Sequence, residues 1–308
     1  MTILEPLHAG EELQGRHLLR IADWSRKELA HTLDLAAELK ELQRQREPHR
    51  LLEGRALGLV FDKPSTRTRI SFEVGMGQLG GTALFLPADQ LQLARGESIR
   101  DTAATLSRYL DAVAVRISSH EDVEELARHA SIPVLNALTD AAHPCQALAD
   151  MLTLRERLGD LAGRRVAWIG DGNNVCASFL AAATSFAMRV VVAAPPGYEP
   201  PASALGSHEL VRDPRDAVAG ADAVYTDVWT SMGHEREQAR RRLNLARYRV
   251  DDELLALAGP DAVVLHCLPA HVGEEITAEV LHGPRSAVWD QAENRLHTQK
   301  ALLALVVR

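Results

Sequence analysis

The sequence has 308 residues, of which 46% are hydrophobic and 25% charged, so it is long enough for two globular domains with separate cores. Its formal net charge of −8 argues against nucleic-acid and acidic-membrane partners, because both bind to basic surfaces. We therefore expect no nucleic-acid partner and no membrane partner.

Three cysteines, Cys145, Cys176 and Cys267, are widely spaced and form no CxxC pair, which is typical of a reducing compartment. The N-terminal residues lack the basic-then-apolar pattern of a signal peptide. No apolar run is long enough to cross a membrane. These features predict a soluble, cytoplasmic protein.

The first predicted helix begins at Ser25, which forms a capping-box pattern with Glu28. A hydrophobic run at 56–61 then predicts a buried strand, and a helical pattern extends from Ile70 to Leu79. The segment between them, 63–69, reads KPSTRTR and combines three cations with three hydroxyl groups.

This segment, 63–69, lies at a predicted helix start, where unpaired backbone N–H groups favour a bound anion. Arginine can bind a phosphate through two parallel hydrogen bonds, and serine and threonine add donors. The alternative is a plain helix start, capped by Ser65 and followed by solvated arginines. The density of cations and hydroxyl groups favours an oxyanion site.

Further strands and helices alternate along the rest of the chain. In the first half we expect a strand at 82–86, a loop at 89–97, a helix from Ser98 to about 110, a strand at 111–116, a helix at 121–130, a strand at 132–135 and a helix at 144–158 that bridges two domains. In the second half we expect strands at 166–169, 190–194, 223–225, 262–265 and 288–290, a helix at 175–187, a charged loop or helix at 235–242 and a closing helix at 292–307.

This alternation predicts an α/β fold with two domains, each a mainly parallel sheet flanked by helices. The predicted domains are 1–142 and 143–291, with the closing helix 292–308 packed back onto the first. Ligands of such sheets bind beyond the carboxyl ends of the strands. Two sheet edges of this kind, formed by the carboxyl ends of the strands and facing each other, predict a substrate cleft between the domains.

Unusual residues collect at these predicted strand ends. In the first half they are cationic or hydrogen-bond donating and suit a small, strongly anionic substrate with a polarisable carbonyl: Arg67, Arg69, Arg116, His143 and Gln146. In the second half they suit a zwitterionic amino acid: Asn174, Asp227, Ser231 and Cys267. The sequence therefore predicts a phosphate compound and an amine as substrates.

Two other interpretations of these strand ends are less favoured. A dinucleotide site would require G-x-G-x-x-G after the strand at 166–169, but Val175 occupies its last position. A zinc site at His266, Cys267 and His271 would contain one sulfur at an unusual ligand spacing. Cys267 itself is either a packed core residue or a functional residue at the rim.

The chain resembles the transcarbamylase family along essentially its whole length. The motifs that carry the resemblance are Ser65–Arg69 (STRTR), His143–Gln146 (HPCQ), Asp227 with Ser231–Gly233 (SMG), His266–Pro269 (HCLP), Phe72–Met76 (FEVGM) and Ala292–Arg295 (AENR). Asp227 with Ser-Met-Gly, together with HCLP, is similar to the ornithine branch of the family. Val272 and Ala177 stand where many relatives have arginine and asparagine, and neither position is assigned to a substrate.

This resemblance implies a carbamoyl transfer from carbamoyl phosphate to the δ-amine of L-ornithine, giving L-citrulline and phosphate. It implies no metal and no cofactor, and a homotrimer or a multiple of trimers. A sister enzyme that uses acetylornithine or putrescine is the alternative, and a catalytically silent paralogue is a more distant one. Asp227 favours ornithine because acetylornithine has no free α-ammonium group, and putrescine has no carboxylate.

The resemblance also implies roles for individual residues. The expected catalytic residues are Arg116, His143, Asp227 and Cys267. The expected carbamoyl-phosphate site comprises Ser65, Thr66, Arg67, Thr68, Arg116, His143, Gln146, Cys267, Leu268 and Arg295, completed by Gln92 of a neighbouring subunit. The expected ornithine site comprises Asn174, Asp227, Ser231 and Met232. Lys63 and Arg69 are expected to support the phosphate site.

Overall fold

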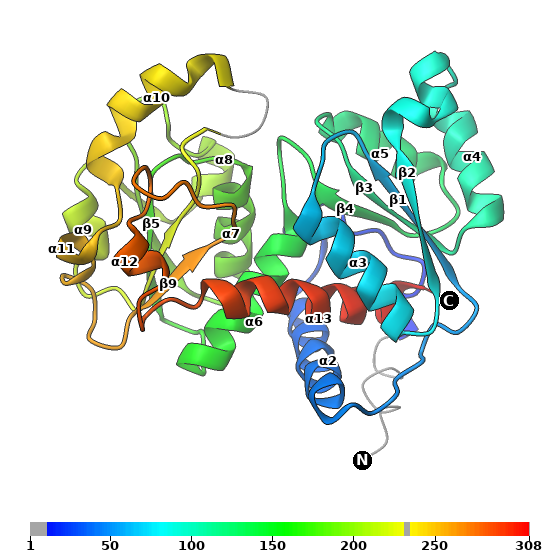
Figure 1. Ribbon diagram of the computed structural model, residues 1–308, viewed down its shortest axis with the longest axis horizontal. Coiled ribbons are helices and arrows are strands. Elements are labelled where there is room, and N and C mark those ends of the chain that lie inside the picture. Colours follow the sequence, from blue (N-terminus) through cyan, green and yellow to red (C-terminus); the bar gives the residue numbers. More distant parts are fainter. Residues whose placement is uncertain (1–10, 231–234, 308) are drawn as a thin grey trace. The chain divides into compact units, whose positions relative to one another are not determined.

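The computed structural model describes residues 11–230 and 235–307 and divides into two compact units (Figure 1). One unit comprises Met1–Leu152 and Glu293–Arg308, and the other comprises Thr153–Ala292. Two helices, α6 (Pro144–Leu158) and α13 (Val288–Val306), contain residues of both units.

The first unit is built on a four-stranded parallel sheet in the order β2-β1-β3-β4. Its elements are η1 (Glu11–Leu13), η2 (Ile21–Asp23), α2 (Arg26–Gln45), β1 (Ala56–Phe61), α3 (Thr66–Gln78), β2 (Thr82–Pro87), η3 (Ala88–Gln90), η4 (Gln92–Arg95), α4 (Ile99–Tyr109), β3 (Ala112–Arg116), α5 (His120–His129) and β4 (Val134–Leu138). The predicted loop at 89–97 contains the two short 3₁₀ turns η3 and η4.

The second unit is built on a five-stranded parallel sheet in the order β7-β6-β5-β8-β9. Its elements are β5 (Arg165–Ile169), α7 (Asn174–Ser185), β6 (Arg189–Ala193), α8 (Ala202–Leu205), β7 (Glu209–Val211), α9 (Pro214–Val218), β8 (Ala223–Thr226), η5 (Glu235–Glu237), α10 (Gln238–Leu245), η6 (Ala246–Tyr248), α11 (Asp252–Leu255), β9 (Val263–His266) and α12 (Ala278–Leu281).

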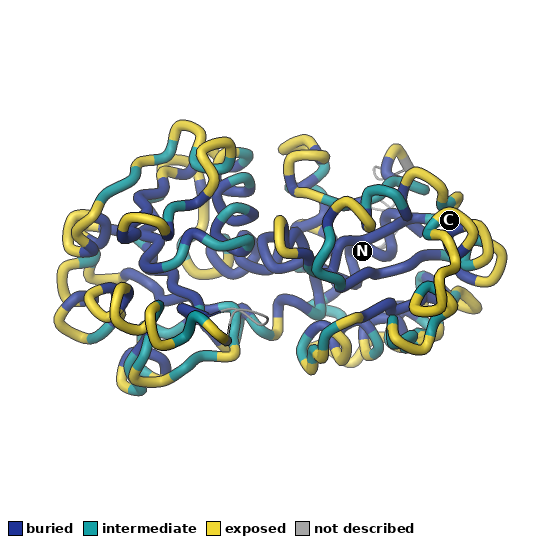
Figure 2. The backbone as a smooth tube through the Cα atoms, turned by 90° about the horizontal axis from the view of Figure 1, so that it is seen from above, coloured by how far each residue is buried: buried dark blue, intermediate teal, exposed yellow. Residues whose placement is uncertain are grey.

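The predicted α/β class with parallel sheets is confirmed in both units. The central strands are hydrophobic runs and are buried, as expected for strands covered by helices on both faces. Figure 2 shows this distribution within each unit, where exposed residues lie mainly on the surrounding helices and loops. Trp168, Phe179 and Tyr225 pack together in the second core, with ring centroids 4.6 Å apart for Trp168 and Tyr225.

Two details of the sequence prediction were wrong. The expected strand at 288–290 is the first turn of α13, and on the side away from β8 the strand β9 pairs only through an isolated bridge between Val264 and Ser286 in the described residues. The short strand β7 was not predicted, since three residues carry too little periodicity to be recognised. The charged segment 235–242 lies in η5 and α10. Within the residues described, no helix combines the length and hydropathy needed to cross a membrane.

The strand order places a topological switch point in each sheet. Chain connections run outward in opposite directions from β1 and β3 in the first sheet and from β5 and β8 in the second. Ligands of open parallel sheets bind in the crevice beyond the carboxyl ends of such strand pairs. The two switch points therefore mark where each unit is expected to bind a ligand.

Candidate active site

The switch point of the first unit brings Arg116 beside the cationic turn at 63–69. Phe61 at the end of β1 is in register with Arg116 at the end of β3, and Asp62 donates its backbone N–H to the Arg116 carbonyl at 3.0 Å. Arg116 is 6% exposed. This buried guanidinium therefore lies next to the segment that the sequence singles out as an anion site.

The start of α3 differs from the other serine-capped helix starts. Ser65 occupies the N-cap position, but its side chain makes no capping hydrogen bond. In contrast, Ser25, Ser98 and Ser119 each accept a backbone N–H of their own helix. The first N–H groups of α3 and the Ser65 hydroxyl are therefore available to a ligand, and the helix dipole favours a negative one.

A chain of hydrogen bonds connects this helix start to two other motifs. Arg295 donates from Nη2 to the hydroxyl oxygen of Thr68 at 3.2 Å and from Nη1 to Oε1 of Gln146 at 2.7 Å. Gln146 in turn donates from Nε2 to Asp150 at 2.8 Å. Thr68, Gln146 and Arg295 are at most 3% exposed. Three segments that are remote in the sequence therefore meet at one buried polar cluster.

Two other cations of the turn are engaged with neighbouring side chains. Arg69 pairs with Glu73 at 2.8 Å, and its guanidinium carbon lies 3.9 Å from the ring centroid of Phe85. Lys63 lies 3.5 Å from a carboxylate oxygen of Asp140. Both arrangements agree with supporting roles, which leaves Arg67 as the cation that we assign to the ligand.

His143 is buried immediately before α6, and its pKa lies well below the ordinary value of 6.5. Burial is the largest cause, and the positive charges of Arg295, Arg116 and Arg67 lower the pKa further. The imidazole is therefore neutral at physiological pH, and one of its nitrogens carries a hydrogen that can be donated.

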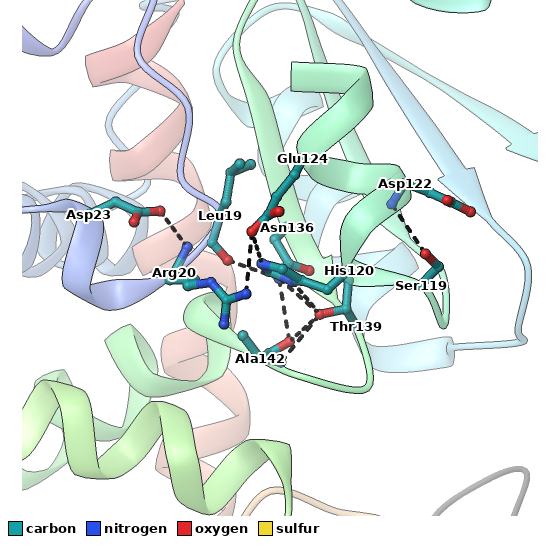
Figure 3. Close-up of polar contacts among 10 residues, drawn as sticks. All are labelled: Leu19, Arg20, Asp23, Ser119, His120, Asp122, Glu124, Asn136, Thr139 and Ala142. Atoms are coloured by element: carbon teal, nitrogen blue, oxygen red, sulfur yellow. Dashed lines mark hydrogen bonds and ion pairs between the residues drawn. The ribbon is translucent and has the colours of Figure 1, made fainter. Parts of the chain in front are cut away.

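A polar network holds the loop that leads to His143 (Figure 3). Thr139 is its centre: its hydroxyl is 2.8 Å from Nδ1 of His120 and accepts the backbone N–H of Ala142 at 3.2 Å. Asn136 donates to the Leu19 carbonyl at 2.9 Å. The residue before His143 is thus fixed by three separate parts of the first unit.

The switch point of the second unit contains a buried carboxylate, Asp227, directly after β8. Asp227 is 4% exposed. Its Oδ2 accepts a hydrogen bond from Nδ2 of Asn173 at 2.7 Å, and its Oδ1 lies 3.0 Å from the Cys267 sulfur, which donates to it. Neither of these donors is a cation, so the contacts to Asp227 are not ion pairs.

Asn173 has a second task, which the sequence analysis missed. Its Oδ1 accepts the backbone N–H groups of Val175 and Cys176 and so caps α7. The preceding Gly172 is required because a Cβ there would lie 2.1 Å from the backbone nitrogen of Pro200. The two asparagines after β5 therefore have different roles: Asn173 donates a hydrogen bond to Asp227, and Asn174 is the first residue of α7.

A partly buried ion pair also connects the loops of this unit. Arg241 on α10 pairs with Asp171 at 2.8 Å and donates to the Trp229 carbonyl at 3.1 Å. Its guanidinium carbon lies 5.2 Å from the ring centroid of Tyr198. Arg241 is not recognisable from the sequence, because it is one cation within a charged segment that has the composition of a solvated surface.

The turn after β9 carries Cys267 and Leu268. His266 accepts the backbone N–H of Leu268 at Nδ1, at 2.9 Å, and its Nε2 is 3.0 Å from Glu275. Donor atoms of Asp227, His266 and Cys267 lie within 4.8 Å of one another. Hydrogen bonds already engage the Asp227 carboxylate and both ring nitrogens of His266, so we interpret this group as hydrogen-bonded and not as a metal site.

The structure thus distributes the predicted residues over two sites. The first unit brings together Thr68, Arg116, His143, Gln146 and Arg295 beside Ser65, Thr66 and Arg67. The second unit brings together Asp227 and Cys267, with Asn174 and Leu268 in the adjoining segments. Gln92 is exposed in η4, and Ser231 and Met232 lie outside the described residues.

Two family models match successive parts of the chain. Residues 16–156 match the carbamoyl-P binding domain of aspartate/ornithine carbamoyltransferase. Residues 162–306 match the Asp/Orn binding domain of the same family. The matches follow one another in chain order and together span most of the sequence.

Individual relatives are similar over nearly the whole chain. An ornithine carbamoyltransferase of Methanoculleus marisnigri is 53% identical over 299 residues, covering 95% of this chain and 97% of its own. An anabolic ornithine carbamoyltransferase of Pyrococcus furiosus is 51% identical and covers 96% and 97%.

Solved structures of ornithine carbamoyltransferases are similar as well. The enzyme from Pyrococcus furiosus aligns with a TM-score of 0.92 at 51% identity and covers 96% of this chain and 98% of its own. The enzyme from Thermus thermophilus aligns with a TM-score of 0.88 at 48% identity and covers 95% and 99%.

Proposed function

The chain belongs to the aspartate/ornithine carbamoyltransferase family, and we propose that it transfers the carbamoyl group of carbamoyl phosphate to the δ-amine of L-ornithine. The products are L-citrulline and phosphate, as in arginine biosynthesis. The observation that carries the proposal is the uncapped start of α3 beside Arg116, at the switch point of the first sheet.

The first unit binds carbamoyl phosphate in this proposal, through the domain predicted at 1–142 with the closing helix 292–308. The phosphate lies on the N–H groups of α3 and on the side chains of Ser65, Thr66, Arg67 and Thr68. Fixed positive charge there stabilises the phosphate as it leaves, without reorganisation during the reaction. Arg295, which also donates to Gln146, donates to the Thr68 hydroxyl and so holds it in place.

The carbonyl oxygen of the carbamoyl group is assigned to Arg116, His143 and Thr68. Negative charge develops on this oxygen when the amine attacks, and donors aimed at developing charge are usually the largest catalytic contribution. The depressed pKa of His143 means that it acts as a neutral donor. The positive charge at the oxygen is then supplied by Arg116.

The second unit binds ornithine in this proposal, through the domain predicted at 143–291. The buried Asp227 carboxylate suits the α-ammonium group, and its contact with Cys267 brings the thiol to the same point. Asn174, Ser231 and Met232 complete the ornithine site and, with Asp227, orient the amine for attack. Cys267 and Leu268 are assigned to the place where the two substrates meet.

The reaction balances without a group from outside the two substrates. The neutral δ-amine forms a bond to the carbamoyl carbon, and the bond between that carbon and the phosphate oxygen breaks. The proton lost by the attacking nitrogen passes to the departing phosphate. The proposal therefore includes no cofactor and no strong general base on the protein.

We extend the proposal to a homotrimer, or a multiple of trimers, in the cytoplasm. An assembly is supported by exposed apolar side chains on α3 and on the edge strand β2, namely Ile70, Val74 and Leu84. The exposed position of Gln92 in η4 agrees with a role in a neighbour's site. A reducing compartment is supported by the three cysteines, none of which forms a disulfide.

One assay tests the function against its nearest alternative. Carbamoyl phosphate is incubated with ornithine, acetylornithine or putrescine in parallel, and the ureido product and phosphate are both measured. The expected result is turnover with ornithine, at least two orders of magnitude faster than with the other amines. Preferred turnover of acetylornithine or putrescine would replace the proposed substrate, and tight substrate binding without turnover would indicate a silent paralogue.

A further inference from the structure

Beyond the ornithine site, the loop after β9 gathers a second set of ligand-type side chains. His271, Glu274 and Glu275 each offer a donor atom, and these atoms all lie within 4.8 Å of one another. The chain folds back here through Gly273, which has a φ of +90°, and the Glu274 N–H donates to the His271 carbonyl at 2.9 Å. This turn brings an imidazole and two carboxylates to one side of the loop.

Each of these three side chains has a buried polar atom without a hydrogen-bond partner in the described part of the chain. The atoms are Nδ1 of His271, Oε2 of Glu274 and Oε2 of Glu275. Glu275 is fully buried, at 0% exposure. A buried polar atom without a partner is unfavourable, so one such atom on each of three clustered side chains indicates a missing ligand.

The second oxygen of Glu275 is already fully occupied. Oε1 accepts the His271 backbone N–H at 2.6 Å and lies 3.0 Å from Nε2 of His266. Because Nδ1 of His266 accepts the Leu268 N–H, its proton resides on Nε2, which donates to Glu275. These bonds fix the Glu275 side chain and leave Oε2 as the acceptor for something else.

The charges around the loop also favour a cation. Glu274 and Glu275 are both acidic side chains, and the neighbouring His266 accepts at Nδ1 and donates from Nε2. The cation that faces them is Arg242 of α10, which donates from Nε to Oε1 of Glu274 at 2.9 Å. Its side chain is 52% exposed, so its charge is partly screened by solvent. Arg242 contacts Glu274, whereas in the described residues the Glu275 carboxylate at the buried end pairs with no arginine or lysine.

We propose that His271, Glu274 and Glu275 form a binding site for a divalent transition-metal ion such as Mn²⁺, Co²⁺ or Zn²⁺. One imidazole nitrogen with two carboxylate oxygens is a donor set that these ions accept, and water completes the coordination. Glu275 connects the site to His266 and thereby to the turn at 266–269. A bound ion therefore acts on this turn through the Glu275–His266 contact.

The experiment uses the full-length protein after treatment with a chelator. Mn²⁺ is titrated in and its free concentration is followed by electron paramagnetic resonance, and Co²⁺ is titrated in an absorption experiment. The expected result is one ion per chain, with a Co²⁺ spectrum that lacks thiolate charge transfer. Glu274→Gln and His271→Ala should each weaken binding about tenfold or more.

Three further variants test whether the measured Mn²⁺ binding comes from this site. Glu279→Gln, an exposed glutamate of α12, is the matched control and should bind Mn²⁺ normally. Arg242→Gln should tighten binding, because it removes the cation that competes for Glu274. Cys267→Ser should leave Mn²⁺ binding unchanged, which distinguishes this site from the group of Asp227, His266 and Cys267.

Several outcomes would overturn the proposal. They are the absence of Mn²⁺ and Co²⁺ binding at millimolar concentration, unchanged binding in both Glu274→Gln and His271→Ala, and loss of binding in Cys267→Ser. Thermal unfolding of each variant without metal shows whether the variant is folded. Glu274 is half-buried, so we expect the fold to tolerate the Glu274→Gln substitution. Carbamoyl-transfer activity is measured separately, so failure of the metal site leaves the proposed function intact.

Discussion

Arg295 and Gln146, which are 149 residues apart in the sequence, share a buried hydrogen bond of 2.7 Å from Nη1 to Oε1. Arg295 also reaches the Thr68 hydroxyl at 3.2 Å. A single guanidinium thereby joins the start of α3, the start of α6 and the interior of α13. Its planar fork matches two acceptors at once, which a lysine ammonium cannot reproduce in the same geometry.

Arg295→Gln should weaken carbamoyl-phosphate binding about 10- to 100-fold, the range expected for losing a charged hydrogen-bond donor at roughly 1.5–3 kcal/mol. Arg295→Lys should recover only part of the loss, because it restores the charge without the fork. Binding is measured by calorimetry, with the exposed Arg128→Gln of α5 as the control. Carbamoyl-phosphate affinity that stays unchanged in Arg295→Gln would contradict the assignment.

Asp227→Asn should affect ornithine and spare carbamoyl phosphate. The substitution keeps the shape of the side chain but removes the carboxylate that we assign to the α-ammonium group of ornithine. We expect kcat/KM for ornithine to fall about 100-fold or more, which corresponds to roughly 3 kcal/mol. Steady-state kinetics with each substrate varied in turn measures this. Asp261→Asn, at an exposed position of the same unit, is the control, and a defect limited to carbamoyl phosphate would refute the role of Asp227.

Much of the fold was predictable because its strands are hydrophobic runs with clear ends. Parallel sheets covered on both faces leave this signal in the sequence, and it placed Arg116 and Asp227 correctly at the ends of β3 and β8. The signal fails for short elements. Val288–Asp290 has the composition of a strand, yet its neighbours in α13 determine its conformation.

The partners of the site residues were less predictable than the residues themselves. Asn173 and Arg241 act through contacts at distances of 54 and 70 residues in the sequence, and no local pattern records such contacts. The missing cap at Ser65 does leave a trace in the sequence: Ser25, Ser98 and Ser119 are each followed three residues later by an acidic residue, whereas Ser65 is followed by Thr68. The sequence therefore indicates which residues are unusual, and the fold determines which of them meet.

His143 should act as a neutral hydrogen-bond donor, and its variants can test this. Its pKa is lowered below 6.5 by burial first and then by Arg295, Arg116 and Arg67, so the neutral form persists as pH falls below 6.5. His143→Asn keeps an N–H donor and should retain more activity than His143→Leu, for which we expect a loss in kcat of about 100-fold or more.

The pH dependence of kcat provides the second test of His143. Because the imidazole is already neutral, the pH profiles of the wild type and His143→Asn should have the same shape between pH 5.5 and 7.5, a range chosen around the ordinary histidine pKa of about 6.5. Rates are measured at saturating concentrations of both substrates. An acidic limb near pH 6.5 that is present in the wild type and absent from His143→Asn would contradict the neutral form.

Lys300 should make stability depend on pH in the alkaline range. It is fully buried in α13, its ammonium group lies 3.0 Å from Nε2 of His49, and burial lowers its pKa from 10.5 to about 8. The facing histidines are also neutral, since burial lowers the pKa of His49 and lowers that of His297 to about 3. Lys40 is the other cation that acts on His297.

Between pH 8 and 10.5 the unfolded chain holds a proton at Lys300 that the folded protein has released, so the free energy of unfolding rises with pH over this window. The gain approaches about 1.4 kcal/mol per pH unit, or about 3 kcal/mol in total, and is lost as pH falls back through 8. Lys300→Met should remove this rise, whereas Lys27→Met, an exposed lysine of α2, should keep it. Urea unfolding at several pH values measures the difference, and curves for the wild type and Lys300→Met that run parallel across the window would show that Lys300 keeps its ordinary pKa in the folded protein.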